Sequence, residues 1–248
     1  MYNPFALIGK TILVTGASSG IGKACAIECS KMGARVVITG RNEERLLSTF
    51  EQLEGQGHAS ICADICQQSD IEQITATTEE LDGVVFAAGV SKLKPIMALN
   101  EMDLQTVFST NYFAQALLTK SLLKAKKIRQ GASLVYISSI SGNGNTATGL
   151  SVYGSSKSAL TSYVRYAALE LSGKQIRCNA ILPGRINTDL LQNSTMSDEQ
   201  IQKDMERYPL KRYGVPEEVA QTAVFLLSDA AKWITGTEIK IDGGRTLV

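Results

Sequence analysis

The stretch TGASSGIG, Thr15 to Gly22, places three glycines between an apolar run, TILVT (11–15), and an amphipathic segment, IGKACAIECSKMG. The apolar run predicts a β-strand and the amphipathic segment predicts a helix, so the stretch is a strand-to-helix turn. Gly16 lets the strand turn sharply, Gly20 lets a phosphate group approach the backbone, and Gly22 lets helix and strand pack closely. The N-terminus of the following helix favours an anion such as a pyrophosphate. The spacing G-x3-G-x-G differs from the common dinucleotide spacing, so this turn alone is a weak signal.

The same alternation of strand and helix continues along the whole chain. Apolar, β-branched runs predict seven strands at 11–15, 35–39, 59–62, 83–87, 133–138, 176–182 and 238–241. Several runs are apolar at every position, which is typical of strands buried on both faces. The longest helical segments are about 100–127 and 151–172. We therefore predict one doubly wound, Rossmann-type α/β domain over 1–248, with a parallel sheet between two layers of helices.

Composition excludes several classes of function. Lys plus Arg is 25 and Asp plus Glu is 24, a net charge of +1 that gives no reason to expect a nucleic acid or an anionic membrane as partner. No apolar run is long enough to span a bilayer, and MYNPFALIGK does not resemble a signal peptide, so we expect a cytoplasmic protein. The five cysteines are an odd number and form no ligand-like cluster with His58. We expect buried free thiols and no metal.

Further motifs follow the glycine turn in a fixed order. YGSSK (153–157) opens the helix 151–172 and places Tyr153 and Lys157 one turn apart on one face. YISSISG (136–142) places Ser139 at the carboxyl end of a predicted strand, at the edge of the sheet where the glycine turn lies. With Asn111-Tyr112, PGRINT (183–188) and IDGG (241–244), the chain resembles the short-chain dehydrogenase/reductase family over almost its whole length.

The resemblance implies a catalytic tetrad of Asn111, Ser139, Tyr153 and Lys157. Tyr153 would exchange a proton with a carbonyl or alcohol oxygen that Ser139 also binds, and Lys157 would favour the phenolate. Asn111 would hold a water that connects Lys157 to solvent. Judged singly, the Tyr-Lys pair reads as an amphipathic helix face and the Ser-Ser pair as a turn, with Ser138 as competitor for the role of Ser139. Their co-occurrence around one crevice favours the catalytic interpretation.

The cofactor implied by the resemblance is a nicotinamide dinucleotide. Where a carboxylate would select NAD(H), this chain has Gly40 followed by Arg41, whose guanidinium suits a 2′-phosphate. We therefore favour NADP(H) over NAD(H), although Arg41 as a solvated charge at a helix start remains the alternative. The other expected cofactor contacts are Gly16, Ser18, Ser19, Gly20, Ile21, Gly22, Asp64, Ile65, Ala88, Gly89, Tyr153, Lys157, Pro183, Gly184, Ile186 and Thr188.

One departure from the family pattern concerns the segment after the fourth strand. The family usually has N-N-A-G there, and this chain has Phe86-Ala87-Ala88-Gly89. Ala88 and Gly89 keep the close backbone approach to the cofactor. We expect local repacking at Phe86 and Ala87 without loss of activity.

The substrate side of the site is less determined. We expect a carbonyl or alcohol substrate to contact 91–93, the polar loop 141–150 and a mobile lid at about 189–212. A 3-oxoacyl-(acyl-carrier-protein) reductase is the first hypothesis, and a basic patch of Lys124, Lys126, Lys127 and Arg129 near the pocket would favour its acidic carrier. A basic helix C-terminus that complements the helix dipole is the commoner reason for such residues. A dehydrogenase for a steroid, sugar or other alcohol is the second hypothesis. A non-catalytic cofactor-sensing scaffold is the third, and the complete tetrad argues against it.

Apolar side chains on the two long helices predict an oligomer. Phe113, Leu117 and Leu118 on one helix, and Tyr163, Tyr166 and Leu169 on the other, are expected to face outward. Pairing both helices across a two-fold axis would bury them, as members of the family commonly do. With a second contact through the C-terminal IDGGRTLV we expect a homotetramer, with a dimer as the fallback.

Overall fold

Seven parallel strands form one sheet at the centre of the molecule, in the order β3-β2-β1-β4-β5-β6-β7. The computed structural model describes residues 3–188 and 197–248. The strands are β1 Thr11–Thr15, β2 Arg35–Gly40, β3 Ala59–Cys62, β4 Leu81–Phe86, β5 Ile128–Ile137, β6 Arg177–Pro183 and β7 Glu238–Ile241. The order changes direction after β1, which is the topological switch of a doubly wound sheet. The predicted fold class is confirmed.

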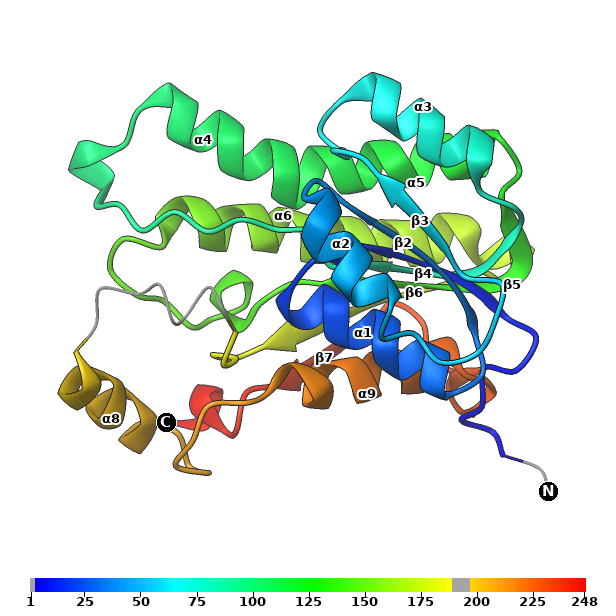
Figure 1. The fold of residues 1–248 in the computed structure, drawn as a ribbon. Helices are drawn as coiled ribbons and strands as arrows, with labels where there is room; N and C mark the ends of the chain where they lie inside the picture. The colour runs from blue at the N-terminus through cyan, green and yellow to red at the C-terminus, as the bar shows by residue number, and fades with distance from the viewer. Residues whose placement is uncertain (1–2, 189–196) are drawn as a thin grey trace.

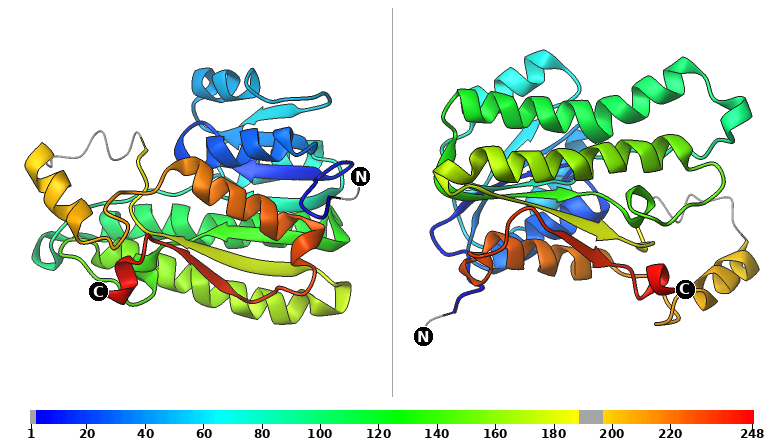
Figure 2. Two further views of the ribbon diagram at one scale, coloured as in Figure 1. Left: turned by 90° about the horizontal axis from the view of Figure 1, so that it is seen from below. Right: turned by 180° about the vertical axis from the view of Figure 1, so that it is seen from behind.

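Helices cover both faces of this sheet (Figures 1 and 2). One face carries α3 Gln68–Thr77, α4 Glu101–Phe108, α5 Ala114–Lys124 and α6 Ser151–Leu171, and the other carries α1 Gly20–Lys31, α2 Glu43–Phe50 and α9 Pro216–Leu227. The helix α8 Asp198–Glu206 lies apart from both layers, beyond the edge of the sheet at which the strands end (Figure 1). Short 3₁₀ turns occupy Ile96–Ala98, Ile140–Gly142, Ser172–Lys174, Asp229–Ala231 and Arg245–Leu247.

The pattern of burial explains why the strands are apolar at every position. All five residues of β1 and all seven of β6 are buried, because each strand has a helical layer above and below it. Side-chain caps fix the starts of α2 and α4. Asn42 accepts a hydrogen bond from the Arg45 amide at α2, and Asn100 and Asp103 form a capping box at α4. None of the described helices is both long and apolar enough to cross a membrane.

The segment predicted as one helix over 100–127 is divided into three parts. A five-residue π-helical segment, Ser109–Phe113, joins α4 to α5. A π-helical turn holds more residues than an α-helical turn, so it shifts the phase of every side chain after it. The strand predicted at 133–138 is also longer, since β5 begins at Ile128 and pairs irregularly with β4 between Leu81 and Gly83.

The exposure of a leucine and of two cysteines was predicted wrongly. Leu118 is fully buried, while Phe113 and Leu117 are exposed, so α5 turns only part of the expected set outward. Cys25, Cys29 and Cys178 are buried free thiols as predicted, but Cys62 and Cys66 are exposed. Cys62 lies on the edge strand β3, where fewer neighbours cover its side chain.

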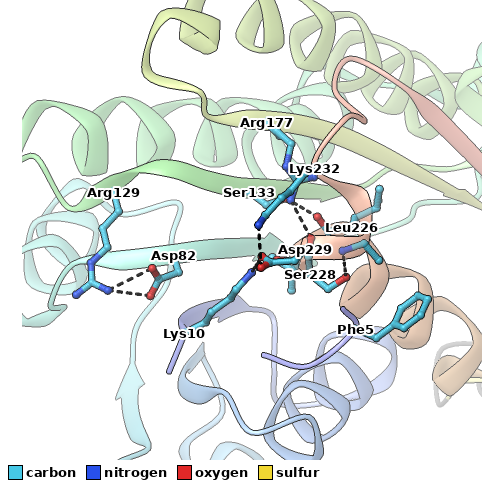
Figure 3. A network of polar contacts seen from close by, with 12 residues as sticks. Phe5, Lys10, Asp82, Arg129, Ser133, Arg177, Leu226, Ser228, Asp229 and Lys232 are labelled. Atoms are coloured by element: carbon cyan, nitrogen blue, oxygen red, sulfur yellow. Dashed lines mark hydrogen bonds and ion pairs between the residues drawn. The ribbon is translucent and has the colours of Figure 1, made fainter. Parts of the chain in front are cut away.

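Polar contacts connect neighbouring elements at the edge of the sheet where the strands begin (Figure 3). Lys10 Nζ donates to Asp229 Oδ1 over 2.8 Å and to the Leu227 carbonyl over 3.1 Å, which ties β1 to the end of α9. The Thr11 amide donates to Asp82 over 2.8 Å. Next to this network, Trp233 follows the turn after α9, and its side chain is 100% exposed.

The basic residues considered for a patch near the pocket lie at this same edge. Lys124 is the last residue of α5, and Arg129 is the second residue of β5. The Arg129 guanidinium pairs with Asp82 (Figure 3) and also with Glu80, so its charge is locally balanced. Because the candidate site lies where the strands end, these four basic residues do not surround its mouth.

Candidate functional site

The glycine turn and the segment after β4 approach each other at the carboxyl edge of the sheet. Gly16 has φ +66°, and a Cβ added to it would lie 2.7 Å from the Cα of Ala88. A Cβ on Gly22 would overlap the Gly16 carbonyl oxygen. The Thr15 hydroxyl oxygen accepts hydrogen bonds from the amides of Ala87 and Ala88 over 3.2 and 3.3 Å. Side chains at these two glycines are therefore excluded by the fold itself.

The N-terminus of α1 is open to an anionic ligand. Ser19 is the N-cap residue, and its side chain accepts no capping hydrogen bond. The first turn of α1 holds no acidic residue. Gly20 has φ +52°, and a Cβ there would lie 3.3 Å from Thr188 Cγ2, so Thr188 covers this end of the helix. Free amide groups and the helix dipole make this turn fit a pyrophosphate.

Ser139, Tyr153 and Lys157 come together next to this turn. Ser139 follows β5 by two residues, and Tyr153 and Lys157 lie in the first two turns of α6. The Ser139 side chain lies near enough to the Tyr153 hydroxyl to lower its pKa. Lys157 Nζ donates to the Ile137 carbonyl over 2.7 Å and lies 6.0 Å from the centroid of the Tyr153 ring.

Burial determines the protonation of both titratable groups. Burial raises the pKa of Tyr153, and its interaction with the Ser139 side chain opposes that rise. Burial lowers the pKa of Lys157 to about 8, because removal from water disfavours the ammonium form. At neutral pH Tyr153 therefore carries its proton, and Lys157 is largely cationic.

Asn111 holds the segment that follows β4. Its Oδ1 accepts from the Val90 amide over 2.8 Å, and its Nδ2 donates to the Val90 carbonyl over 2.9 Å. Nδ2 also donates to the hydroxyl of Ser156 in α6 over 3.0 Å. A Cβ added to Gly89 would lie 3.4 Å from both Asn111 Oδ1 and Lys157 Nζ. Asn111 and Lys157 thus lie against the same short stretch of backbone.

The neighbouring serine, Ser138, has a different environment. Its hydroxyl is buried and is hydrogen-bonded to the Lys157 carbonyl over 3.1 Å and to the Thr161 hydroxyl over 2.7 Å. These contacts join β5 to α6. Ser138 is therefore engaged in packing, and Ser139 is the serine that meets Tyr153.

Arg41 and Asp64 lie side by side at the ends of β2 and β3. The Arg41 guanidinium is 3.9 Å from Asp64 Oδ2, and the Arg41 side chain is 63% exposed. Asp64 Oδ1 accepts from the Cys66 amide over 3.0 Å, while the neighbouring Ile65 is buried. A Cβ added to Gly40 would lie 3.2 Å from Ser18, so this strand end also touches the glycine turn.

The PGRINT segment continues from the end of β6 across the same edge. Pro183 is the last residue of β6 and pairs with Ile241. A Cβ on Gly184 would lie 3.0 Å from the Cα of Asp242, and Ile186 is buried and bridges to Gly214. Together with Thr188 over Gly20, this segment faces the glycine turn across the sheet edge.

The Phe86-Ala87 departure is accommodated by an aromatic stack. The Phe86 ring stacks on Tyr136 with centroids 4.4 Å apart and planes 4° apart. Gln115 was not singled out from the sequence, yet its side chain is fully buried and donates to the Ala88 carbonyl over 2.9 Å. A buried polar residue in a helix carries no distinctive local pattern, and only the fold shows that Gln115 and Thr15 support Ala88.

The predicted substrate side is described only in part. Residues 189–196 of the predicted lid lie outside the described residues, and 198–206 form α8. In the loop 141–150, the Asn143 amide donates to Glu238 on β7, so this side chain is engaged in a contact within the protein. Within 3–188 and 197–248, no cluster of three or more His, Cys, Asp or Glu side chains could hold a metal ion.

Comparison with known proteins agrees with this geometry. A family model described as Enoyl-(Acyl carrier protein) reductase matches residues 16–246, which covers every element from the glycine turn to the C-terminal turn. The chain belongs to the short-chain dehydrogenase/reductase family. It is thus an NAD(P)-dependent oxidoreductase, and the resemblance inferred from the motifs is confirmed.

Relatives in this family differ in their substrates. The 3-oxoacyl-[acyl-carrier-protein] reductase of Rickettsia prowazekii (strain Madrid E) is 31% identical, and the match covers 98% of this chain and 99% of that protein. The L-rhamnose 1-dehydrogenase (NAD(P)(+)) of Azotobacter vinelandii is 35% identical, with 96% and 97% coverage. A proposed 2-deoxy-d-gluconate 3-dehydrogenase from Agrobacterium tumefaciens, solved with bound NADP, has a TM-score of 0.88, 28% identity and full coverage of both chains.

Proposed function

We propose that this protein transfers a hydride between NADP(H) and a carbonyl or secondary alcohol substrate, with Asn111, Ser139, Tyr153 and Lys157 as its catalytic residues. The observation that carries the proposal is that Ser139 and Lys157 both lie close to Tyr153, with Lys157 Nζ also beside Gly89. A scaffold protein would have no need of a buried lysine next to a buried tyrosine hydroxyl, because burying both groups costs stability.

In the reductive direction, Tyr153 acts as the general acid. Its hydroxyl is protonated at neutral pH and donates its proton to the substrate oxygen as negative charge develops there. The Ser139 hydroxyl donates a second hydrogen bond to that oxygen and fixes its position. The ammonium of Lys157 stabilises the phenolate left on Tyr153, and Asn111 fixes the backbone against which both residues lie.

Each part of the nicotinamide cofactor has residues suited to hold it. The turn Gly16–Gly22, with Ser18, Ser19, Gly20 and Ile21, would take the pyrophosphate. Asp64 and Ile65 would bind the adenine, and Ala88 and Gly89 would lie against the ribose. Pro183, Gly184, Ile186 and Thr188, with Tyr153 and Lys157, would surround the nicotinamide, which supplies or accepts the hydride.

The preference for NADP(H) rests on Arg41. It is an exposed guanidinium at the end of β2, where a 2′-phosphate would replace the distant contact with Asp64. Bound NADP in the Agrobacterium tumefaciens relative supports the same choice.

The first candidate substrate is a 3-oxoacyl thioester carried by an acidic carrier protein. This candidate is supported by the similarity to the Rickettsia relative. A sugar or other secondary alcohol is the second candidate. It is supported by the Azotobacter relative and by the position of the four basic residues, which lie at the opposite edge of the sheet and so provide no surface for an acidic carrier beside the site. We retain a single domain with a lid at 189–212, a homotetramer, and, from the odd set of free thiols, a cytoplasmic location as parts of the proposal.

A substrate screen tests this function. Loss of NADPH absorbance is followed with a 3-oxoacyl thioester, a 3-oxo ester, sugar lactones and simple ketones, and the reverse reaction is followed with rhamnose and gluconate. In parallel, Tyr153→Phe should lose roughly 10²–10⁴-fold in kcat with NADPH affinity nearly unchanged. Tyr166→Phe, on the exposed side of the same helix, is the control. A Tyr153→Phe enzyme with wild-type kcat would refute the catalytic assignment.

A further inference from the structure

Asp103, which completes the capping box of α4, is a buried carboxylate that also pairs with two lysines. It lies in the first turn of α4, and its side chain is 1% exposed. Lys94 Nζ contacts its Oδ2 over 2.6 Å, Lys92 Nζ pairs with its Oδ1, and the Asn100 amide donates to Oδ2 over 3.1 Å. Lys92 and Lys94 hold the pKa of this carboxyl well below its usual range. Asp103 is therefore ionised at every pH at which the enzyme would work.

Both lysines lie in the chain segment that follows Gly89, beside the proposed catalytic residues Asn111 and Lys157. This segment, residues 90–100, begins directly after Gly89, where a Cβ would touch Asn111 and Lys157. Asn111 holds its first residue, Val90, through two hydrogen bonds. Asp103, two turns before Asn111 on the same continuous helical stretch, holds its third and fifth residues. Two side chains of one helical stretch thus fix the path of this segment.

The segment in turn contacts the chain that leads to Tyr153. The Lys94 amide donates to the Gly149 carbonyl over 2.9 Å, and a Cβ on Gly149 would lie 3.0 Å from Leu93. Gly149 precedes α6 by two residues and Tyr153 by four. A displacement of residues 92–94 would therefore shift the start of α6, which carries the proposed general acid Tyr153.

The capping box of α4 needs only an acceptor at this position, which an uncharged amide side chain could supply, so it does not account for the two lysines. A buried ion pair is often no more stabilising than apolar residues of similar size, whereas it fixes geometry through directed contacts. Here the contacts are directed at the segment that runs from Gly89 to its contact with Gly149, just before α6.

We propose that Asp103 is a positioning residue for substrate binding, which acts through Lys92 and Lys94 to fix the segment 90–94 as a wall beside Tyr153. It contacts neither the cofactor nor the reacting atoms. The proposal rests on the proposed function, because the wall has meaning only if a carbonyl substrate binds next to Tyr153. Its loss raises the KM for that substrate and leaves the affinity for NADPH unchanged.

The test combines steady-state kinetics with hydrogen exchange of the full-length protein. Asp103→Asn keeps the size of the side chain and removes its charge. We expect KM for the best carbonyl compound of the screen to rise about tenfold or more, with kcat lowered less than threefold and the NADPH dissociation constant within twofold. Amides of 90–100 should exchange faster, and those of 16–22 should be unchanged. Glu101→Gln, an exposed acid in the same turn, is the matched control and should alter none of these.

A second variant protects the test against misfolding. Asp103→Asn with Lys92→Met and Lys94→Met leaves no unpaired charge at the cluster, and its KM should equal that of Asp103→Asn alone, because all three residues act as one unit. Faster exchange with an unchanged KM would overturn the positioning role, and so would a parallel loss of NADPH affinity. Unchanged exchange at 90–100 would overturn the proposal that Asp103 fixes this segment. This measurement needs no substrate, so its failure can be told apart from failure of the proposed function.

Discussion

Lys157 is the residue whose charge sets the pH range of the proposed reaction. Its ammonium is buried, and its pKa is lowered to about 8, so the cation is present below that pH and is lost as pH rises through it. Without the cation the phenolate of Tyr153 is less stable, and proton donation becomes harder. We expect kcat/KM for carbonyl reduction to fall above about pH 8, as a pH profile at saturating NADPH would show. A profile that stays flat to much higher pH would contradict this role of Lys157.

Arg41 is the residue on which cofactor choice depends. If its guanidinium binds the 2′-phosphate, Arg41→Ala should weaken NADPH by about one to two decades and NADH far less, since a charge-assisted hydrogen bond contributes about 1.5–3 kcal/mol. Arg45→Ala, an exposed arginine in the next turn, is the control. Adding Gly40→Asp should invert the preference, with a small adjustment of Ser18, which lies 3.2 Å from the new Cβ. Titration of both cofactors measures this, and equal losses would show that Arg41 does not read the phosphate.

At the scale of the element, the π-helical segment places Asn111 inside the molecule. Asn111→Ala leaves the Val90 amide and carbonyl without their buried partners, and each such group costs about 1–3 kcal/mol. We expect a clear fall in the melting temperature, followed by circular dichroism, together with lower kcat/KM. Thr110→Ala, at a half-buried neighbour in the same segment that does not contact Val90, should change the melting temperature less. Two variants of equal stability would show that the Val90 contacts contribute nothing.

The same element shows where sequence patterns stop being informative. Strand positions were predicted within a few residues, because β1 and β3 are bounded by clear changes of composition. The proposed catalytic residues were predicted from motifs with fixed spacing, and the structure brings Ser139, Tyr153 and Lys157 together. The outward face of α5 was predicted too wide: Leu117 is exposed, while Leu118, the next residue round the helix, is buried. Gln115 and Asp103 act through distant partners, which no local pattern reveals.

At the scale of the whole molecule, exposed apolar side chains on α5 and α6 remain to be covered. Phe113, Leu117, Tyr166 and Leu169 are all exposed, and a groove of about 420 Å³ between the helices is lined by Tyr112, Tyr163 and Tyr166. A two-fold pairing of this face would bury the same patch on both copies. We expect a homotetramer, with a dimer as the fallback, and Leu169→Glu should reduce the assembly by placing two like charges in the interface. A wild-type mass near the single-chain 26.7 kDa in sedimentation equilibrium at micromolar concentration would contradict the pairing.

The position of Trp233 decides how this protein can be followed by spectroscopy. It is the single tryptophan of the chain, and its indole is fully exposed beside the amino ends of the strands. Its emission already comes from a hydrated ring, so unfolding should shift the emission maximum little. Tryptophan fluorescence would therefore change only slightly across a thermal melt, even where the protein unfolds completely. The indole also lies at the edge opposite the nicotinamide site, so quenching of its emission is a poor reporter of cofactor binding. The emission of NADPH itself, and the near-ultraviolet dichroism of the buried Tyr136, are the signals that report on the site and the core.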